Sequence, residues 1–227
     1  MNIFRVFLES GLAAQIIMAT LVICSIWSWA VFFKKLYDLS ATKKRSQSFF
    51  SAYRFHRSIK DYENLGHLLN DNPYGKILKT GLDEYKGLLT QNLVTNPKIL
   101  ELAENIKMAM TKTRNDEIDR LGSWLPSLGT IMTAGPFLGL LGTVWGIMES
   151  FLEVRARGSA HITVVAPGIS DALITTVYGL LVAIPALFFH NFLRGKINTI
   201  DGQLDDFVTD VFTRFRRSLI ETEQPKP

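Results

Sequence analysis

Two long uncharged runs limit what this chain can fold into. Residues 121–148 contain no Asp, Glu, Lys or Arg, and residues 162–193 contain only one of these, Asp171. Each run exceeds the ~20 apolar residues that an α-helix needs to cross a bilayer. A charged side chain inside such a span costs roughly 2.5–3.5 kcal/mol on insertion scales, so Asp171 is a candidate functional residue.

A third uncharged run, residues 12–33, precedes these two. A signal peptide has a shorter apolar core, of about 7–15 residues, followed by a small-residue cleavage site. Here the run ends in aromatic residues and is followed directly by Lys34 and Lys35. Aromatic residues followed by cations are typical of the cytoplasmic end of a retained anchor. We therefore expect an all-α integral membrane protein with three transmembrane helices.

The distribution of Lys and Arg predicts the topology. Residues 34–120 contain sixteen of them, residues 194–227 contain six, and residues 149–161 contain two. Because positive charge is retained on the cytoplasmic side, residues 34–120 and 194–227 should be cytoplasmic. The N-terminus, residues 1–11, and the short polar loop 149–161 should then be periplasmic.

Helical apolar spacing dominates the two cytoplasmic segments. In residues 34–120 it is interrupted by turn signals at 72–75 and 96–97, and it then predicts a helix running straight into the second span. The tail from residue 194 has an apolar stripe that predicts an amphipathic continuation of the third span. This stripe should pack on the large loop or on a neighbouring subunit.

Composition argues against several other functions. The pI of 9.2 is explained by basic residues that flank the spans and can contact membrane lipid, so we expect no nucleic-acid partner. Cys24 is the only cysteine, which excludes a disulfide framework. His56 and His67 have no second ligand at metal spacing, and His161 is most simply an interfacial loop residue. We expect no metal and no cofactor.

Small residues and prolines mark the second and third spans. The second span contains four glycines that are three or four residues apart: Gly135, Gly139, Gly142 and Gly146. At this spacing they share one helix face, which lets another helix approach closely. Gly179 continues a small face in the third span. Pro126 and Pro136 in the second span and Pro185 in the third each free a carbonyl and kink the axis.

The polar residues of the spans leave alternatives open. Thr143 lies on the glycine face and can either bond its own backbone or present a hydroxyl to a pore. The spans contain no Lys or Arg that could pair with Asp171, so its carboxyl stays protonated or faces water or a partner. Alternatively, Asp171 is an interfacial cap among the headgroups. Together with Thr143, Thr175 and Thr176, it suggests a conduction unit.

Three strings carry a family resemblance. Residues 139–148 read GLLGTVWGIM, residues 165–176 read VAPGISDALITT, and residues 183–186 read AIPA. They resemble the second and third spans of the TolQ/ExbB/MotA proton-channel family. The similarity covers nearly the whole chain and is greatest to the TolQ branch, with SIWSWA at 25–30 and DFVTDVFT at 206–213.

The resemblance implies an assembly and a proton pathway. It implies an inner-membrane homo-pentamer, a ring whose second and third spans line a pore holding two single-span TolR-type subunits. In the family a carboxylate of that partner chiefly carries the proton, supported by residues that fall on Thr143, Thr176 and Asp171 here. The usual acid is glutamate, so Asp171 is a departure, and Thr175 stands where alanine is usual.

The implied function is the use of the proton motive force to energise the Tol-Pal system. Work would pass through the TolR-type subunit and a TolA-type protein to the outer membrane, supporting envelope integrity and constriction at division. One alternative is an ExbB-type subunit that energises TonB-dependent uptake, and another is a non-conducting membrane scaffold. An enzyme is disfavoured, because the sequence shows no nucleophile with a base, no metal-ligand cluster and no phosphate loop.

Overall fold

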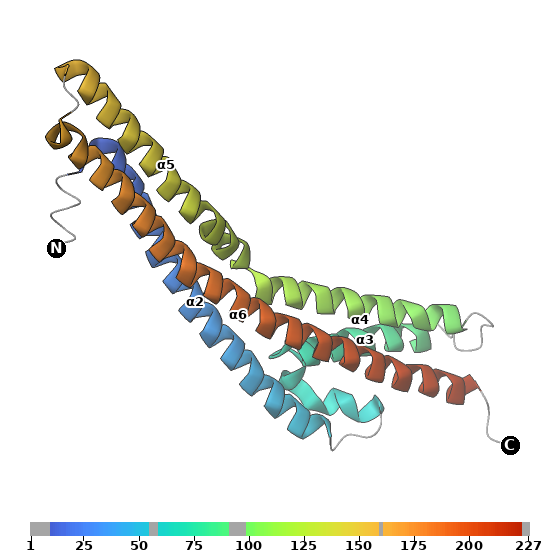
Figure 1. Cartoon of the computed structure of the whole chain (residues 1–227). Coiled ribbons are helices and arrows are strands. Elements are labelled where there is room, and N and C mark those ends of the chain that lie inside the picture. Colours follow the sequence, from blue (N-terminus) through green and yellow to red (C-terminus); the bar gives the residue numbers. More distant parts are fainter. Residues whose placement is uncertain (1–9, 55–58, 91–98, 159–160, 224–227) are drawn as a thin grey trace. The chain divides into compact units, whose positions relative to one another are not determined.

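The computed structural model describes residues 10–54, 59–90, 99–158 and 161–223, and all secondary structure in these ranges is helical (Figure 1). The all-α architecture predicted from the sequence is confirmed. His56 and the turn signal at 96–97 lie outside the described residues. The elements are α2 (Leu12–Tyr53), the 3-10 helix η1 (Ile59–Leu69), α3 (Pro73–Thr90), α4 (Ile99–Gly122), α5 (Leu125–Arg157) and α6 (Ile162–Glu223).

Helices α2, α5 and α6 are each long and apolar enough to cross a membrane. Each extends beyond its predicted span, because a polar sequence that keeps helical propensity does not need to end a helix where the bilayer ends. Helix α2 continues from the first span to Tyr53, and α6 joins the third span and the tail in one 62-residue helix.

The connection between α4 and α5 differs from the prediction. The helix before the second span was expected to run straight into it, but α4 ends at Gly122 and α5 begins at Leu125. Between them Trp124 adopts a left-handed conformation with φ of 73°. Pro126 explains the break, because it lacks an N–H and fits the first turn of a helix, where none is needed. Pro126 therefore lies in the first turn of α5 and does not kink a span, whereas Pro136 lies inside the helix.

The predicted polar loop at residues 149–161 is also mostly helical. Helix α5 continues to Arg157 and ends at Gly158, whose φ of 64° is the left-handed conformation that commonly closes a helix. Glu153 and Arg157 form an ion pair of 3.7 Å, four residues apart on this last part of the helix. The apolar run ends at these charged residues, but the helix does not, because opposite charges four residues apart stabilise it.

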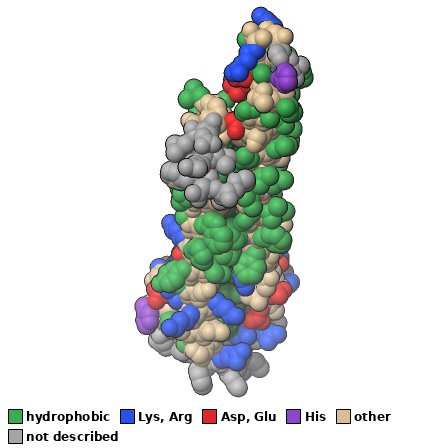
Figure 2. Space-filling model, turned by 60° about the vertical axis from the view of Figure 1, so that its left-hand side comes forward, with side chains coloured by type: hydrophobic (Ala, Val, Ile, Leu, Met, Phe, Trp, Pro, Cys, Tyr) green, Lys and Arg blue, Asp and Glu red, His purple; other side chains and the backbone are tan. Residues whose placement is uncertain are grey.

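The described residues belong to two compact units. Unit 1 comprises residues 1–34 and 124–194, and unit 2 comprises residues 35–123 and 195–227. In unit 1, α2, α5 and α6 meet in a small apolar cluster of Ile17, Leu21, Ile131, Val182 and Ala186. Many other large apolar side chains of these helices are exposed, among them Phe137, Leu140, Val144, Leu173, Val177 and Phe188. Figure 2 shows such a hydrophobic surface, which suits lipid or other membrane helices.

Unit 2 has a larger apolar core. The apolar stripe of the tail is buried in this core through Leu204, Phe207, Val211, Phe215 and Leu219. Of the two alternatives left open by the sequence, the tail thus packs on the large loop of the same chain. Phe215 stacks on Tyr85 of α3 with ring centroids 5.2 Å apart. Arg214 lies 5.6 Å from the centre of the Tyr53 ring, a cation–π contact that joins α6 to α2.

The turn signal at residues 72–75 is the start of a helix. The side-chain oxygen of Asn72 accepts a hydrogen bond of 2.9 Å from the Gly75 N–H, and Pro73 is the first residue of α3. This is an N-terminal cap, which satisfies a backbone donor that has no partner within the helix. A Cβ atom added at Gly75 would overlap the Leu68 carbonyl oxygen and lie 2.8 Å from the Leu69 Cα.

Gly75→Ala should destabilise the protein by about 1–3 kcal/mol, because backbone atoms must move to make room. The matched control is Gly87→Ala on the same helix, where an added Cβ meets nothing within 4 Å. That change should be neutral or stabilising by about 0.5–1 kcal/mol, since alanine favours a helix over glycine. Thermal unfolding in detergent measures both, and equal shifts would contradict the crowding at Gly75.

Candidate functional site

Helices α5 and α6 approach so closely that their backbones touch. A Cβ atom added at Gly179 of α6 would lie 2.6 Å from the Gly135 carbonyl oxygen. One added at Gly139 would lie 3.0 Å from the Cα of Thr176. All three glycines are buried. Such contact allows van der Waals and polar backbone interactions that larger residues would prevent.

The same contact continues toward the end of α5. The Thr175 side chain is completely buried and occupies the space above Gly142, where an added Cβ would overlap it. Farther along, an added Cβ at Gly146 would lie 2.7 Å from the Gly168 carbonyl oxygen. Ser150 is buried beyond it and donates a hydrogen bond of 2.9 Å to the Gly146 carbonyl.

The three predicted threonines have different surroundings. Thr175 donates to the Ala172 carbonyl at 2.7 Å, and its burial makes it a packing residue in this chain. Thr176 is half-buried and donates across the helix contact to the Gly139 carbonyl at 3.0 Å. Thr143 is half-buried and donates to the Leu140 carbonyl of its own helix at 2.6 Å. Each hydroxyl oxygen can still accept a further hydrogen bond.

Asp171 is hydrogen-bonded to the beginning of α2. Its Oδ1 accepts from the Ser10 hydroxyl and its Oδ2 from the Gly11 N–H, each at 3.0 Å. Ser10 and Gly11 directly precede α2, where backbone donors have no partner within the helix. A carboxylate there satisfies a donor and interacts favourably with the positive end of the helix dipole. The alternatives drawn from the sequence did not include this intramolecular partner.

A second carboxylate lies at the same place. A Cβ atom added at Gly11 would lie 3.1 Å from Glu149 Oε2, and the other oxygen of Glu149 accepts from the Trp145 indole N–H at 3.0 Å. Ser10 is buried, and its carbonyl accepts from the Gln15 side chain at 2.9 Å. Sidechains from α5 and α6 thus meet at the start of α2.

Sequence analysis did not identify Ser10, Gly11 or Glu149 as site residues. The Gly11–Asp171 contact joins residues 160 positions apart, and helical periodicity does not indicate which helix ends meet. Of the other residues that the sequence singled out, Pro185 is half-buried inside α6, beside the buried Ala186. Among the described residues, no group of three His, Cys, Asp or Glu side chains is placed to hold a metal ion.

Comparison with known proteins identifies the family of this chain. A sequence model of the MotA/TolQ/ExbB proton channel family matches residues 69–206, more than half of the chain. The chain belongs to this family. The matched region includes the glycine contact of α5 and α6, the three threonines and Asp171. Membership in the MotA/TolQ/ExbB family, with three apolar helices, indicates a multi-pass protein of the inner membrane.

Individual relatives cover nearly the full chain. The Tol-Pal system protein TolQ of Haemophilus influenzae is 31% identical over 221 residues, which is 96% of this chain and 95% of the relative. TolQ of Pseudomonas aeruginosa is 32% identical over 207 residues, covering 89% and 87%. The biopolymer transport protein ExbB of Salmonella typhimurium is 27% identical over 229 residues, covering 96% and 88%. The resemblance drawn from the motifs is thereby confirmed.

The Thr175–Gly142 contact predicts a compensating pair of mutations. Gly142→Ala should cost about 1–3 kcal/mol, because the new methyl group meets the buried Thr175 side chain. Adding Thr175→Ala should recover more than about 1 kcal/mol of that loss, since residues in contact couple strongly. Gly129→Ala is the control on the same helix, because its nearest neighbour would be 3.8 Å away. Resistance to unfolding in detergent is the measurement, and strict additivity would contradict the contact.

The Asp171 cap predicts local stabilisation of α2. Asp171→Ala removes acceptors at the helix start, so amide hydrogen exchange in the first turn of α2 should become about fivefold faster, as expected for a cap of about 1 kcal/mol. Ser10→Ala should give a smaller increase, because the Gly11 N–H bond remains. Exposed Ser170 is adjacent to Asp171, and Ser170→Ala should have no effect. Unchanged exchange in the Asp171 variant would show that the cap does not stabilise this turn.

Proposed function

We propose that this chain is a TolQ-like inner-membrane subunit of a motor driven by the proton motive force. With a TolR-type partner it forms a proton channel that energises a Tol-Pal system. The observation that carries the proposal is the match to TolQ proteins over almost the whole of both chains, within a proton channel family. A chain that shared only the spans would support a channel, but not this particular role.

The proposed assembly is a homo-pentameric ring around two TolR-type helices. The exposed apolar surface of α5 and α6 supports this assembly, because neighbouring subunits could cover large side chains that unit 1 leaves exposed. Examples are Leu140, Val144, Leu173 and Val177. The tight glycine contact joins α5 and α6 into a closely packed helix pair, which can form one wall of a pore. In the proposed topology the N-terminus is periplasmic and unit 2 is cytoplasmic, which the distribution of Lys and Arg supports.

In the proposed pathway, the partner's carboxylate carries the proton and residues of this chain support it. Thr143 and Thr176 have half-buried hydroxyl groups that can accept hydrogen bonds from water or from the partner. Asp171 of α6 is half-buried against the start of α2, and its Oδ1 can accept a hydrogen bond from another donor in place of Ser10. Thr175 maintains the helix contact from its buried position. A proton crossing 100 mV supplies about 2.3 kcal/mol for each step.

A ring of five subunits around two helices is mismatched in symmetry, so the inner pair cannot bond equally to every subunit. We infer that proton passage rotates the inner pair relative to the ring. The work then passes through the TolR-type subunit and a TolA-type protein to the outer membrane. This role serves envelope integrity and outer-membrane constriction at division.

An ExbB-type role in TonB-dependent uptake is the second candidate, supported by ExbB relatives that also match most of the chain. Complementation separates the two roles. Gram-negative cells that lack their own TolQ should recover envelope integrity with this chain and its TolR-type partner. Rescue confined to cells that lack ExbB would reverse the assignment.

Proton flux into liposomes under an imposed potential tests conduction. Flux should require both this protein and its TolR-type partner, and it should fall about tenfold in Thr143→Val or Thr176→Val. A tenfold loss corresponds to about 1.4 kcal/mol, near the net value of one hydrogen bond. Asp171→Asn should also reduce flux, because the amide has an NH₂ group in place of one carboxyl oxygen and so cannot accept hydrogen bonds at both positions.

Thr133→Val is the matched control for the threonine variants. Thr133 is exposed on α5 and its hydroxyl donates to the Gly129 carbonyl of its own helix, so its loss should leave flux unchanged. If every variant assembles with the partner and conducts like the wild type, the pathway is wrong. Assembly without any flux under a potential would support the non-conducting scaffold.

A further inference from the structure

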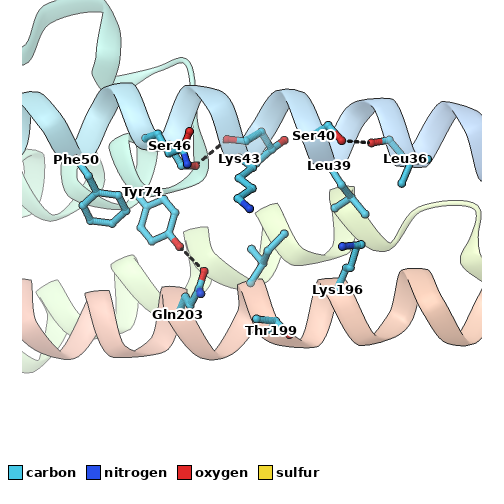
Figure 3. Close-up of a pocket in the computed structure, with 13 residues that line it drawn as sticks. Leu36, Leu39, Ser40, Lys43, Ser46, Phe50, Tyr74, Lys196, Thr199 and Gln203 are labelled. Carbon is cyan, nitrogen blue, oxygen red and sulfur yellow. Dashed lines mark hydrogen bonds between the residues drawn. The ribbon is translucent and has the colours of Figure 1, made fainter.

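A cavity of about 450 Å³ lies within unit 2, between α2 and α6 (Figure 3). Its volume is within the range typical of small-molecule sites, about 300–1,000 Å³. The lining is largely apolar with several polar groups at its sides. The lining residues of α2 are Leu36, Leu39, Ser40, Thr42, Lys43, Ser46, Gln47 and Phe50, and those of α3 and α6 are Tyr74, Lys196, Thr199, Ile200 and Gln203.

Two lysines give this cavity a positive charge. Lys43 of α2 and Lys196 of α6 both line it, and Figure 3 shows their side chains in the space between the two helices. Among its described lining residues none is acidic. Burial raises the pKa of Tyr74, so this hydroxyl stays neutral and donates to Gln203 Oε1 at 3.3 Å. The cavity therefore favours a ligand that has an anionic group and an apolar part.

The lining changes in character along the helices. Leu36 and Leu39 come first on α2, Ser40 and Lys43 follow, and Ser46 comes after them. On α6 Lys196 comes first, Thr199 and Ile200 follow, and the neutral Gln203 comes last. Along α2 two leucines are therefore nearest the span, Lys43 follows among hydroxyl groups, and neutral polar groups come next, with the apolar Ile200 of α6 and Phe50 of α2 among them. A phospholipid has this order: glycerol-linked chains, phosphate and a polar headgroup alcohol.

The cavity begins where the predicted spans end. Leu36 and Lys196 each come three residues after an uncharged run, or about 4.5 Å along a helix at 1.5 Å per residue. The polar layer on each side of a bilayer is about 5–8 Å thick, so Leu36 and Lys196 lie within it. Lys43 comes ten residues after the run, or about 15 Å along the helix, so its side chain must reach back toward the phosphate. Helical side chains incline toward the N-terminus of their helix, which for both lysines is the direction of the span.

We propose that this cavity binds the headgroup of an anionic phospholipid from the adjoining leaflet. The phosphate lies between the ammonium groups of Lys43 and Lys196, with the first carbons of the lipid against Leu36 and Leu39. The headgroup alcohol lies toward Ser46 and Gln203. The site is separate from the conduction residues and does not depend on whether the protein conducts protons.

Native mass spectrometry of the full chain in neutral detergent tests this assignment. The probes are phosphatidylglycerol and phosphatidylcholine with the same acyl chains, and inorganic phosphate as a competitor. Wild type should retain one phosphatidylglycerol per chain in preference to phosphatidylcholine. Lys43→Gln/Lys196→Gln should weaken retention about tenfold or more, since one lysine near anionic lipid contributes about fivefold.

Lys44→Gln/Arg45→Gln is the matched control, because it removes the same charge from exposed neighbours on α2 that do not line the cavity. It should leave retention unchanged. Ser40→Trp is the second variant: it fills the cavity without changing charge and should also abolish retention of phosphatidylglycerol.

Three results would overturn the proposal. An equal loss in the two charge-deleted variants would indicate general attraction to the cytoplasmic surface. Displacement by millimolar inorganic phosphate would indicate a site for a free anion. A change in subunit number with Ser40→Trp, at unchanged lipid retention, would show that a second copy of the chain occupies this groove.

Discussion

The backbone contact between α5 and α6 is the constraint on which unit 1 depends. An added Cβ atom at Gly179 would lie 2.6 Å from a backbone oxygen, and one at Gly135 or Gly139 would lie 3.0–3.1 Å from its nearest neighbour, so the closeness of the two helices depends on these glycines. The same contact fixes the positions of Thr176 and Asp171, because both lie on α6 within one or two turns of it. The chemistry of the site is thus set by residues that have no polar side chain.

The beginning of α2 depends on this pair of helices. An uncapped helix end near a bilayer leaves backbone donors without partners, which is costly where water is scarce. Asp171 supplies the acceptor and Glu149 lies beside it, so two carboxylates surround one helix end. Burying a carboxylate and leaving amide groups unsatisfied are both unfavourable, and here each problem is reduced by the other. This arrangement explains how a chain without an intramembrane Lys or Arg accommodates Asp171.

Much of the fold was predictable because a membrane restricts the choices. Uncharged runs identified the three spans, and the apolar stripe of the tail predicted a helix whose core residues include Phe215. The family was recognisable from the strings around Gly142 and Asp171. Three features were not predictable: the break at Trp124, the helix through Arg157 and the partners of Asp171. The first depends on where Pro126 falls in a helical turn, the second on helix propensity outside the bilayer, and the third on a contact between distant helix ends.

The separation of Asp171 from its partners has a consequence for biogenesis. The Gly11 N–H and the Asp171 carboxylate are 160 residues apart in the chain. At about 5–20 residues per second, a ribosome needs roughly 10–30 s to synthesise the segment between them. During that interval the first span is in the membrane with an incomplete N-terminal end. Formation of this bond therefore coincides with insertion of the last span. A chain whose last span has not yet inserted therefore differs from a finished one at the start of α2, where the acceptors for Ser10 and Gly11 are missing.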